Sequence, residues 1–314
     1  MKFSGGADHG DEETLGYLVT AFTRRESVMR QPIEPGTRLW EDTGLVTFSL
    51  TTGAAFALQV MHPTVGAVVG EHSVFRTDAI GRARRSIASV MTWVYGGEEA
   101  LAEGDRLRTL HAPLKSTVDG VTHKALAAGP YAWIILTAPY AYEAGARYFS
   151  GKPLSPEDAE AFYAEIVQLA RNLHVAEKEI PPTYDAYRKY FDDMLDHTLV
   201  AHRTAYEFLA GTRRIPPPPA LPRLARPLWR VAMDVPGRLQ HFVTVGTLPE
   251  KAREILGLTW TRRDEQVLRA LGFAVGRLLP LLPERLRYFP IAYEARKVDR
   301  ARRALRRALA RRPV

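Results

Sequence analysis

The sequence contains no cysteine. A zinc site built on thiolates, an iron-sulfur cluster, a cysteine nucleophile and a thiolate-bound haem are therefore excluded. Any metal or haem must be held by His, carboxylate, Tyr or Met side chains. The 314 residues are 46% hydrophobic and 25% charged, a composition that indicates a folded chain with one large core or two modest ones, not a disordered or disulfide-stapled chain.

Several enzyme motifs are also missing. Neither G-x-G-x-x-G, G-x-x-x-x-G-K-[ST], G-x-S-x-G nor H-E-x-x-H occurs, which argues against a phosphate-binding loop, a serine hydrolase elbow and a zinc protease helix. None of the nine histidines has a Glu three residues before it. A carboxylate-bridged di-iron site in a helical bundle is therefore not expected.

The chain shows no targeting signal and one long uncharged stretch. No apolar run follows Lys2, so neither a secretory nor an Arg-rich transit signal is present and we predict a cytoplasmic protein. Residues 43–70 carry no formal charge and exceed the roughly 20 residues of a membrane-spanning helix. Gly44, Thr47 and the pair His62-Pro63 interrupt both the apolarity and the helix, so a buried core around a pocket is favoured over a membrane span.

The net charge of +8 is concentrated at one end of the chain. Nine cations and one anion lie between Arg296 and Arg312, whereas the remaining residues hold 34 cations and 34 anions. A narrow apolar stripe runs through the same segment: Ala301, Ala304, Leu305, Ala308 and Leu309. This pattern predicts a basic amphipathic helix, which suits peripheral contact with an anionic membrane surface or a protein partner better than it suits nucleic acid. The alternative is that the stripe docks on its own domain.

The periodicity elsewhere predicts an all-α protein of about twelve helices. Apolar residues recur at spacings of three and four, and alternating strands are absent. Helix starts are expected at Ser155, which precedes Pro and two acidic residues, and at Thr247. The strongest break is the Pro-rich segment 211–227. We expect a crossover within one domain there, because large aromatic residues follow it that should pack on the rest: Trp229, Phe242, Trp260 and Phe273.

These boundaries divide the chain into three parts. Residues 1–34 form an N-terminal segment, residues 35–295 a single helical domain that includes the crossover, and residues 296–314 the basic C-terminal helix.

A candidate site lies on two expected helices. One spans Gly81 to Tyr95, and at about 100° per residue one of its faces carries Arg82, Arg85, Ser86, Ser89 and Trp93. Trp93 favours a partly buried pocket wall over the alternative of a solvated face. A second helix begins near Glu98 and carries His111 close to its end. Histidines and cations in apolar helical surroundings suit a buried haem with two carboxylate propionates.

The residues alone do not single out one histidine. The other candidates for a ligand are His62, His72, His123, His174, His197 and His202. Of these, His62 is held out of the helical region by the proline that follows it.

Short motifs in a fixed order carry a family resemblance. The first group consists of Leu58-Gln59, His62-Pro63, Glu71-His72-Ser73, Arg82-x-x-Arg85-Ser86, Gly96, Leu110-His111 and Tyr131-x-Trp133. The second consists of Tyr163-x-Glu165, Pro181-x-Thr183, Leu248-Pro249, Gly257-Leu258-Thr259-Trp260, Leu282-Pro283-x-Arg285-Leu286-Arg287 and Pro290. Over about residues 35–300 the chain resembles the latex-clearing-protein and MpaB-type oxygenase family.

The resemblance implies an all-α fold with a globin-like core around a haem pocket, one His bound to haem b, and dioxygen-dependent cleavage of an isoprenoid double bond. His111 matches the family's proximal haem ligand. Arg82, Arg85 and Ser86 match its distal Arg-x-x-Lys-Thr cluster. Arg85 stands where the rubber-cleaving branch has Lys, and a guanidinium has no lone pair to offer iron. Lys115-Ser116 follow His111 where members often have a Gly close behind it.

The resulting hypothesis is a haem b-dependent oxygenase that uses dioxygen or peroxide on an apolar substrate, such as an isoprenoid or another alkene. His111 would supply the axial nitrogen, and its other ring nitrogen should donate to a backbone carbonyl or a carboxylate. Arg82 or Arg85 would hold a propionate or stabilise negative charge that develops on oxygen, and Ser86 would donate a hydrogen bond. The alternative is a non-catalytic helical protein that binds haem or lipid.

Overall fold

The structure is a computed structural model that describes residues 29–150 and 154–311. Most of the predicted N-terminal segment 1–34 therefore lies outside the described residues. The first half of the chain forms α2 (Arg38–Thr43), α3 (Phe48–Met61), α4 (Pro63–His72), η1 (Val74–Arg76), α5 (Ala79–Tyr95), α6 (Glu98–His111), β1 (Lys115–Val118), β2 (Val121–Lys124), α7 (Ala128–Leu136), α8 (Ala138–Gly145) and η2 (Ala146–Ser150). The second half forms α9 (Pro156–Asn172), η3 (Glu177–Glu179), α10 (Tyr184–Asp193), η4 (Met194–Thr198), α11 (Arg203–Arg213), η5 (Arg223–Ala225), α12 (Arg226–Ala232), α13 (Asp234–Gly246), α14 (Glu250–Ile255), α15 (Arg262–Leu278), η6 (Leu279–Leu281), α16 (Glu284–Arg287) and α17 (Pro290–Ala310).

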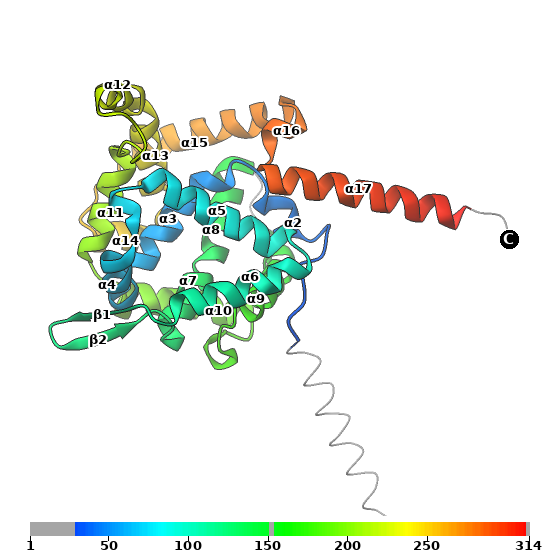
Figure 1. Cartoon of the computed structure of the whole chain (residues 1–314), viewed down its shortest axis with the longest axis horizontal. Coiled ribbons are helices and arrows are strands. Elements are labelled where there is room, and N and C mark those ends of the chain that lie inside the picture. Colours follow the sequence, from blue (N-terminus) through cyan, green and yellow to red (C-terminus); the bar gives the residue numbers. More distant parts are fainter. Residues whose placement is uncertain (1–28, 151–153, 312–314) are drawn as a thin grey trace, which may run out of the picture.

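The all-α prediction is confirmed, with more helices than the expected dozen (Figure 1). The excess arises because short breaks divide stretches of continuous helical periodicity, as at Thr137 between α7 and α8. The cap at Ser155 is confirmed, because its hydroxyl accepts the Asp158 N–H at 3.1 Å. The expected start at Thr247 lies two residues early, because Pro249 is the N-cap of α14.

Helix α3 forms the centre of the core. Ala54, Ala57, Leu58, Val60 and Met61 are all fully buried along it, and the indole Nε1 of Trp133 on α7 donates to the Leu58 carbonyl at 3.0 Å. The uncharged stretch 43–70 is thus core, as predicted. At the His62-Pro63 step the chain bends by 106° into α4.

Among the described residues, no single helix is long and apolar enough to cross a membrane. Only α3 and α4 taken together, bent by 106°, reach that length and apolarity.

The expectation that strands are absent is wrong at one place. β1 and β2 form an antiparallel hairpin that begins four residues after His111, with Lys115 opposite Lys124. Its turn residues Asp119 and Gly120 have φ angles of 49° and 78°, as a tight two-residue hairpin turn requires. The hairpin is missed because most of its side chains are exposed, so its sequence lacks apolar alternation. His72 Nε2 contacts the Lys115 carbonyl at 2.8 Å and ties α4 to the hairpin.

The Pro-rich break is shorter than predicted. α11 continues to Arg213, so residues 211–213 are helical. Trp229 donates from Nε1 to the Ile215 carbonyl at 3.1 Å, and Phe242 packs on Trp260 with ring centroids 5.0 Å apart. Phe242 and Trp260 also pack against a buried cluster that includes Phe149 from the first half of the chain, which agrees with the expected packing for these two aromatics. Phe273 does not, because 67% of it is exposed.

The C-terminal helix begins six residues before the predicted boundary of 296. Its first turns dock on the body: Ala292 is buried, and Arg296 pairs with Glu41 at 2.7 Å and lies 4.3 Å over the Tyr288 ring. All residues from 301 to 311 are exposed, and α17 projects away from the body (Figure 1). The alternative that the apolar stripe docks on its own domain is therefore wrong for this part of the helix.

Candidate functional site

Helices α5 and α6 are joined by a tight turn and diverge as they extend away from it (Figure 1). Asp78 begins α5 by accepting the Gly81 N–H at 3.0 Å, and Gly97 provides the reversal with a φ of 58°, which glycine adopts without strain. Ser89 on α5 donates to Glu103 on α6 at 2.7 Å. Beyond this hydrogen bond the two helices form the arms of what we call the α5–α6 fork, residues 79–89 and 103–111.

Part of the predicted stripe on α5 faces α6. Ser89 contacts Glu103 on α6, and Ser86, one turn earlier on the same stripe, lies on the same side. Arg82, two turns earlier, belongs to the stripe as well, and its guanidinium lies over Phe56 on α3. On the other arm, Leu107 and His111 follow Glu103 by four and eight residues and return to a similar face. The fork therefore brings together the two helices that carry Arg82, Ser86 and His111.

Glu103 holds the base of the fork. Its carboxylate receives two bonds from Arg106, at 2.6 and 2.7 Å, besides the one from Ser89. The Arg106 guanidinium, helped by the Ser89 hydroxyl, lowers the pKa of Glu103 below its usual range. The sequence analysis placed Ser89 on the stripe but missed Glu103, because a Glu followed by Arg at three residues is the ordinary pattern of a surface ion pair.

His111 ends α6 with its imidazole already oriented. Nδ1 lies 2.7 Å from the Leu107 carbonyl, one turn earlier. A carbonyl accepts only, so Nδ1 is the donor, and in the neutral imidazole this tautomer leaves the lone pair on Nε2. This is the hydrogen bond expected for a histidine that offers Nε2 to a metal.

Arg82 is a desolvated cation without an acidic partner. Its guanidinium lies 4.1 Å over the ring of Phe56 on α3. Burial, with the nearby charge of Arg85, lowers the pKa of Arg82 to about 10. No carboxylate of the described residues forms an ion pair with it. An unpaired guanidinium removed from water is costly, so the position favours an anion that the chain itself does not supply.

The other two predicted site residues differ from each other. The Arg85 side chain is 63% exposed and pairs with Asp78 at 3.2 Å, so it is held at the start of its own helix, turned toward solvent. Ser86 is half-buried, and its hydroxyl has no hydrogen-bond partner in the described part of the chain. Trp93, on the same stripe, has a buried indole N–H that also lacks a partner there.

Two further histidines cap helices. Nδ1 of His62 accepts the Thr64 N–H at 3.1 Å, and Nδ1 of His202 accepts the Thr204 N–H at 3.1 Å. Burial lowers the pKa of both imidazoles, so both are neutral at pH 7. His123 is close to both of them. Its Nδ1 contacts the Thr64 hydroxyl at 3.0 Å, and its charge acts on the pKa of both His62 and His202.

Most of the remaining candidate histidines also have partners. His174 pairs with Asp105 and His197 with Asp193, at 2.5 and 3.1 Å. Within residues 29–150 and 154–311, no group of three or more His, Asp or Glu side chains is arranged to hold a metal ion. A haem ligated by one histidine does not need such a group.

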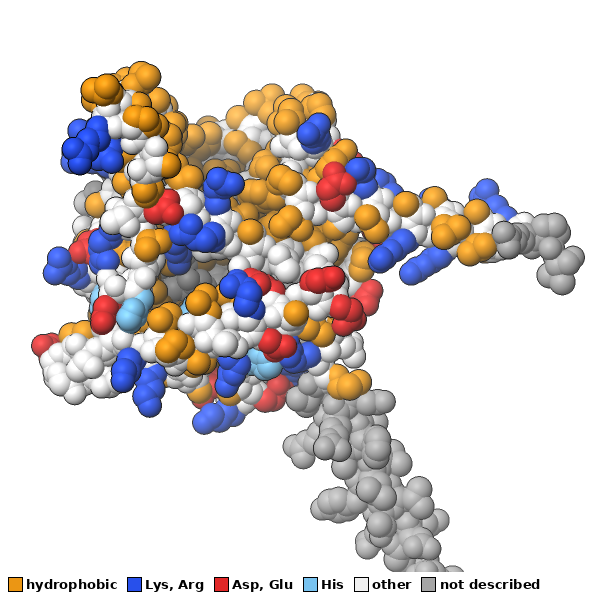
Figure 2. Space-filling model, in the orientation of Figure 1, with side chains coloured by type: hydrophobic (Ala, Val, Ile, Leu, Met, Phe, Trp, Pro, Cys, Tyr) orange, Lys and Arg blue, Asp and Glu red, His pale blue; other side chains and the backbone are white. Residues whose placement is uncertain are grey.

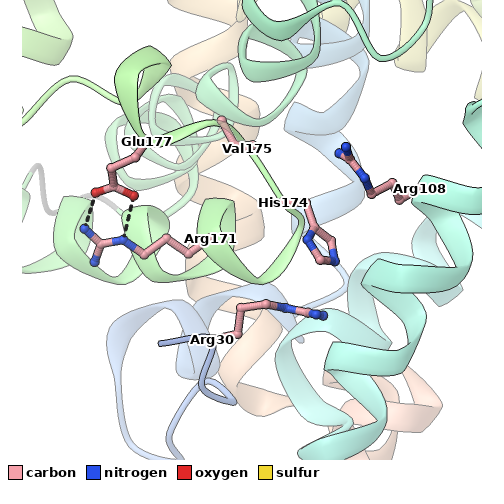
Figure 3. Close-up of a pocket in the computed structure, with 6 residues that line it drawn as sticks. All are labelled: Arg30, Arg108, Arg171, His174, Val175 and Glu177. Atoms are coloured by element: carbon pink, nitrogen blue, oxygen red, sulfur yellow. Dashed lines mark hydrogen bonds and ion pairs between the residues drawn. The ribbon is translucent and has the colours of Figure 1, made fainter. Parts of the chain in front are cut away.

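A second feature lies on the other side of α6. An open depression of about 350 Å³ is lined by Arg30, Arg108, Arg171, His174, Val175 and Glu177 (Figure 3). Asp105 binds both Arg30 and His174, at 2.8 and 2.5 Å, and Glu177 binds Arg171 at 2.5 Å. Asp105 thus joins α6 to Arg30 and to His174, which follows α9, and the Arg171–Glu177 pair joins α9 to η3. We therefore interpret the depression as a structural seam.

Comparison with known proteins assigns the family. A model of the ER-bound oxygenase mpaB/B'/Rubber oxygenase, catalytic domain, matches residues 40–277. No curated protein and no solved structure matched the chain. The matched range contains both arms of the fork and ends within α15, one residue before that helix does. Since it covers well over half of the sequence, the chain belongs to the mpaB/rubber oxygenase catalytic-domain family.

Proposed function

We propose that this protein is a haem b-dependent oxygenase that acts on an apolar substrate, and that the haem binds between the arms of the α5–α6 fork. The observation that carries the proposal is that each arm of the fork carries one group without a partner among the described residues. His111 offers a free Nε2 on α6, and Arg82 offers a desolvated cation without an anion on α5.

The residues of the fork fit the cofactor's chemistry. His111 would bind the iron, and its Nδ1–H bond to Leu107 would fix the ring and raise its basicity. Arg82 would pair with a propionate, since a carboxylate is the anion that a guanidinium binds best. Ser86 contributes a hydroxyl that has no other partner among the described residues. Leu110 on α6 is exposed, and a macrocycle in the fork would cover it.

Each protein group has a separate task in this proposal. When bound, haem would supply the redox chemistry toward dioxygen or peroxide. Arg82 neutralises negative charge at the edge of the site, and Phe56 beneath it excludes water from one face of the guanidinium. Arg85 takes no part, because it is turned outward and paired with Asp78. The apolar substrate class, an isoprenoid or another alkene, follows from family membership together with the apolar residues around the fork.

The experiment is an absorption spectrum of the purified full chain expressed with haem precursors. We expect the intense violet band of haem at one haem per chain. His111→Ala should lose the band while its far-ultraviolet circular dichroism stays helical. His197→Ala is the matched control, because His197 is an exposed histidine paired only with Asp193, and it should keep full haem.

Two outcomes contradict the proposal. Stoichiometric haem with an unchanged spectrum in His111→Ala would assign the ligand to another residue. A wild-type chain that binds no haem, even when haem is added to the purified protein, would favour the alternative of a non-catalytic helical protein that binds lipid or another apolar molecule.

A further inference from the structure

An apolar stripe on η5, α12 and α13 faces solvent. It consists of Leu224, Leu228, Val231, Val235 and Leu239, each between 44% and 96% exposed. Leu224 belongs to η5, Leu228 and Val231 to α12, and Val235 and Leu239 to α13, so the exposed apolar side chains run across three successive elements. In a soluble domain an apolar helix face normally packs on the core. Here no residue of η5 or α12 is buried.

A second apolar group projects from the same edge of the molecule. It lies at the end of α15, on η6 and on α16, and consists of Phe273, Leu278, Leu281, Leu282 and Leu286, each between 43% and 78% exposed. Figure 2 shows hydrophobic side chains gathered over α12 and over the α15–α16 projection, at one edge of the face in view. We call these two groups the apolar edge. It is larger than the scattered single residues that a soluble surface ordinarily exposes.

Arginines without acidic partners accompany both groups. Arg223, Arg226 and Arg230 belong to η5 and α12, and Arg277, Arg285 and Arg287 belong to α15 and α16. None of the six forms an ion pair within the described residues. The carboxylates near them in sequence are already used, since Asp234 binds Arg238 and Glu284 binds Arg300. The edge therefore combines exposed leucines with uncompensated positive charge.

We infer that the apolar edge docks on the surface of an anionic lipid bilayer. The leucines and valines would enter the boundary between headgroups and acyl chains, where each gains the free energy of leaving water. The arginines would remain at headgroup level, their stems packed along the leucines and their guanidiniums on lipid phosphates. Because haem takes no part in this contact, the inference stands independently of the proposed function.

The charge pattern favours a bilayer over a second copy of the chain. A twofold interface places the same surface patch of two copies against each other. Here that would bring two sets of unpaired arginines together, with the nearby Asp234 and Glu284 already engaged. The apolar residues also lie on two separate projections (Figure 2), whereas a flat and continuous face would suit a dimer.

The outer part of α17 provides a second basic contact. Leu305 and Leu309 are exposed on its stripe, and Arg302, Arg306 and Arg307 have no ion pair among the described residues. A helix of this kind lies in the plane of an anionic surface. Its contribution is mainly electrostatic, because only two of its exposed residues beyond Arg300 are large and apolar.

The test is sedimentation of the purified full chain with vesicles of phosphatidylcholine, alone or mixed with phosphatidylglycerol. We expect binding to the mixed vesicles only. Leu224→Ser/Leu228→Ser/Val231→Ser should weaken it by roughly tenfold or more. Arg223→Gln/Arg230→Gln should weaken it and reduce its dependence on salt. The matched control is Val118→Ser/Val121→Ser, which removes exposed valines from the β-hairpin and should bind as the wild type does. All variants should unfold near the wild-type temperature, since the changed side chains are not buried.

A second measurement reports insertion directly. The chain has no cysteine, so Leu228→Cys and Val121→Cys each accept one environment-sensitive fluorophore. On mixed vesicles, emission from position 228 should shift to the blue and emission from position 121 should not.

Three results would overturn the inference. The first is equal binding of the wild type and the triple serine variant, and the second is equal emission shifts at positions 228 and 121. The third is a wild type that ignores anionic vesicles and forms a dimer that the triple serine variant converts to a monomer, which would make the apolar edge an interface between copies.

Discussion

The guanidinium of Arg82 lies 4.1 Å over the ring of Phe56 and has no carboxylate partner among the described residues. The face of an aromatic ring compensates a cation only partly, by about 0.5–2 kcal/mol. The remaining cost of burying the charge appears as a lowered pKa of Arg82, about 10, because burial penalises the protonated form. Without a ligand, Arg82 therefore destabilises the fold, and an anion in the fork would relieve the penalty.

Arg82→Met should separate stability from cofactor binding. Methionine keeps the length and packing over Phe56 but removes the charge, so the haem-free variant should be more stable than the wild type by roughly 1–3 kcal/mol. Haem affinity should fall, because the partner of a propionate is lost. Chemical denaturation of the haem-free chain and haem titration measure the two effects. Arg84→Met, at an exposed position of the same helix, is the control. A less stable Arg82→Met with unchanged haem affinity would contradict this role. Unchanged occupancy with about 100-fold slower alkene oxidation would instead assign Arg82 to the oxidation step itself.

Arg85→Ala should leave the absorption spectrum of the haem-loaded ferric protein unchanged. Arg85 is exposed, is paired with Asp78, and has no lone pair for iron. The variant should lose only the modest stability of a surface ion pair, up to about 1 kcal/mol. A shift of the ferric bands in Arg85→Ala would show that residue 85 acts beside the iron after all.

Acid should destabilise the fold through the capping histidines. Burial holds the pKa of His62 and His202 below the unfolded value of 6.5. As the pH falls below 6.5, the unfolded chain therefore binds protons that the folded chain does not, and the free energy of unfolding decreases. Two other titratable groups act on these residues. The charge of His123 lowers the pKa of both His62 and His202, and Glu207 raises the pKa of His202.

His62→Asn/His202→Asn should flatten this decrease between pH 6.5 and 5, because Asn keeps the cap without titrating. Thermal unfolding at a series of pH values measures this pH dependence of stability. His197→Asn, at an exposed residue outside any cap, should retain the wild-type slope. An unchanged slope in the double variant would assign the acid sensitivity to other groups.

Two truncations separate the docked and projecting parts of α17. Ending the chain after Arg300 removes, among the described residues, only the exposed residues 301–311. The fold and haem content should therefore stay unchanged while binding to anionic vesicles weakens, by at most about 1 kcal/mol per basic residue. Ending it after Glu294 also removes Arg296, with its contacts to Glu41 and Tyr288, and should lower the unfolding temperature. Equal unfolding temperatures for the two truncated chains would contradict the docking described for Arg296.

The sequence predicted the helices of the site and the face that carries it. The apolar period of 3.6 residues located the start of α5 to within two residues and the start of α6 at Glu98, and Ser89 of the polar stripe does contact α6. Spacing could not predict which stripe residue turns outward. Arg85 lies beside Arg82 in the motif, yet Asp78, the cap of the same helix, binds Arg85, and no acid among the residues that the structure describes binds Arg82.

The apolar edge is a second feature that residue spacing alone could not predict. The spacing from Leu224 to Leu239 is typical of an apolar helix face, although the residues lie on η5, α12 and α13. Periodicity does not tell whether such a face meets the core or solvent. The hairpin after His111 was missed for a related reason, because exposed strands carry little apolar alternation. Only the pair Asp119-Gly120 signalled it.

We propose that Nε2 of His111 holds a haem in the α5–α6 fork, and the most direct test of this ligation is haem binding by purified His111→Gly with and without imidazole, followed by absorption spectroscopy. We expect the variant to bind haem weakly. Imidazole, which fills the space of the missing side chain, should restore both the affinity and the wild-type spectrum if His111 is the ligand. Full haem binding by His111→Gly without imidazole, with the wild-type spectrum, would contradict it.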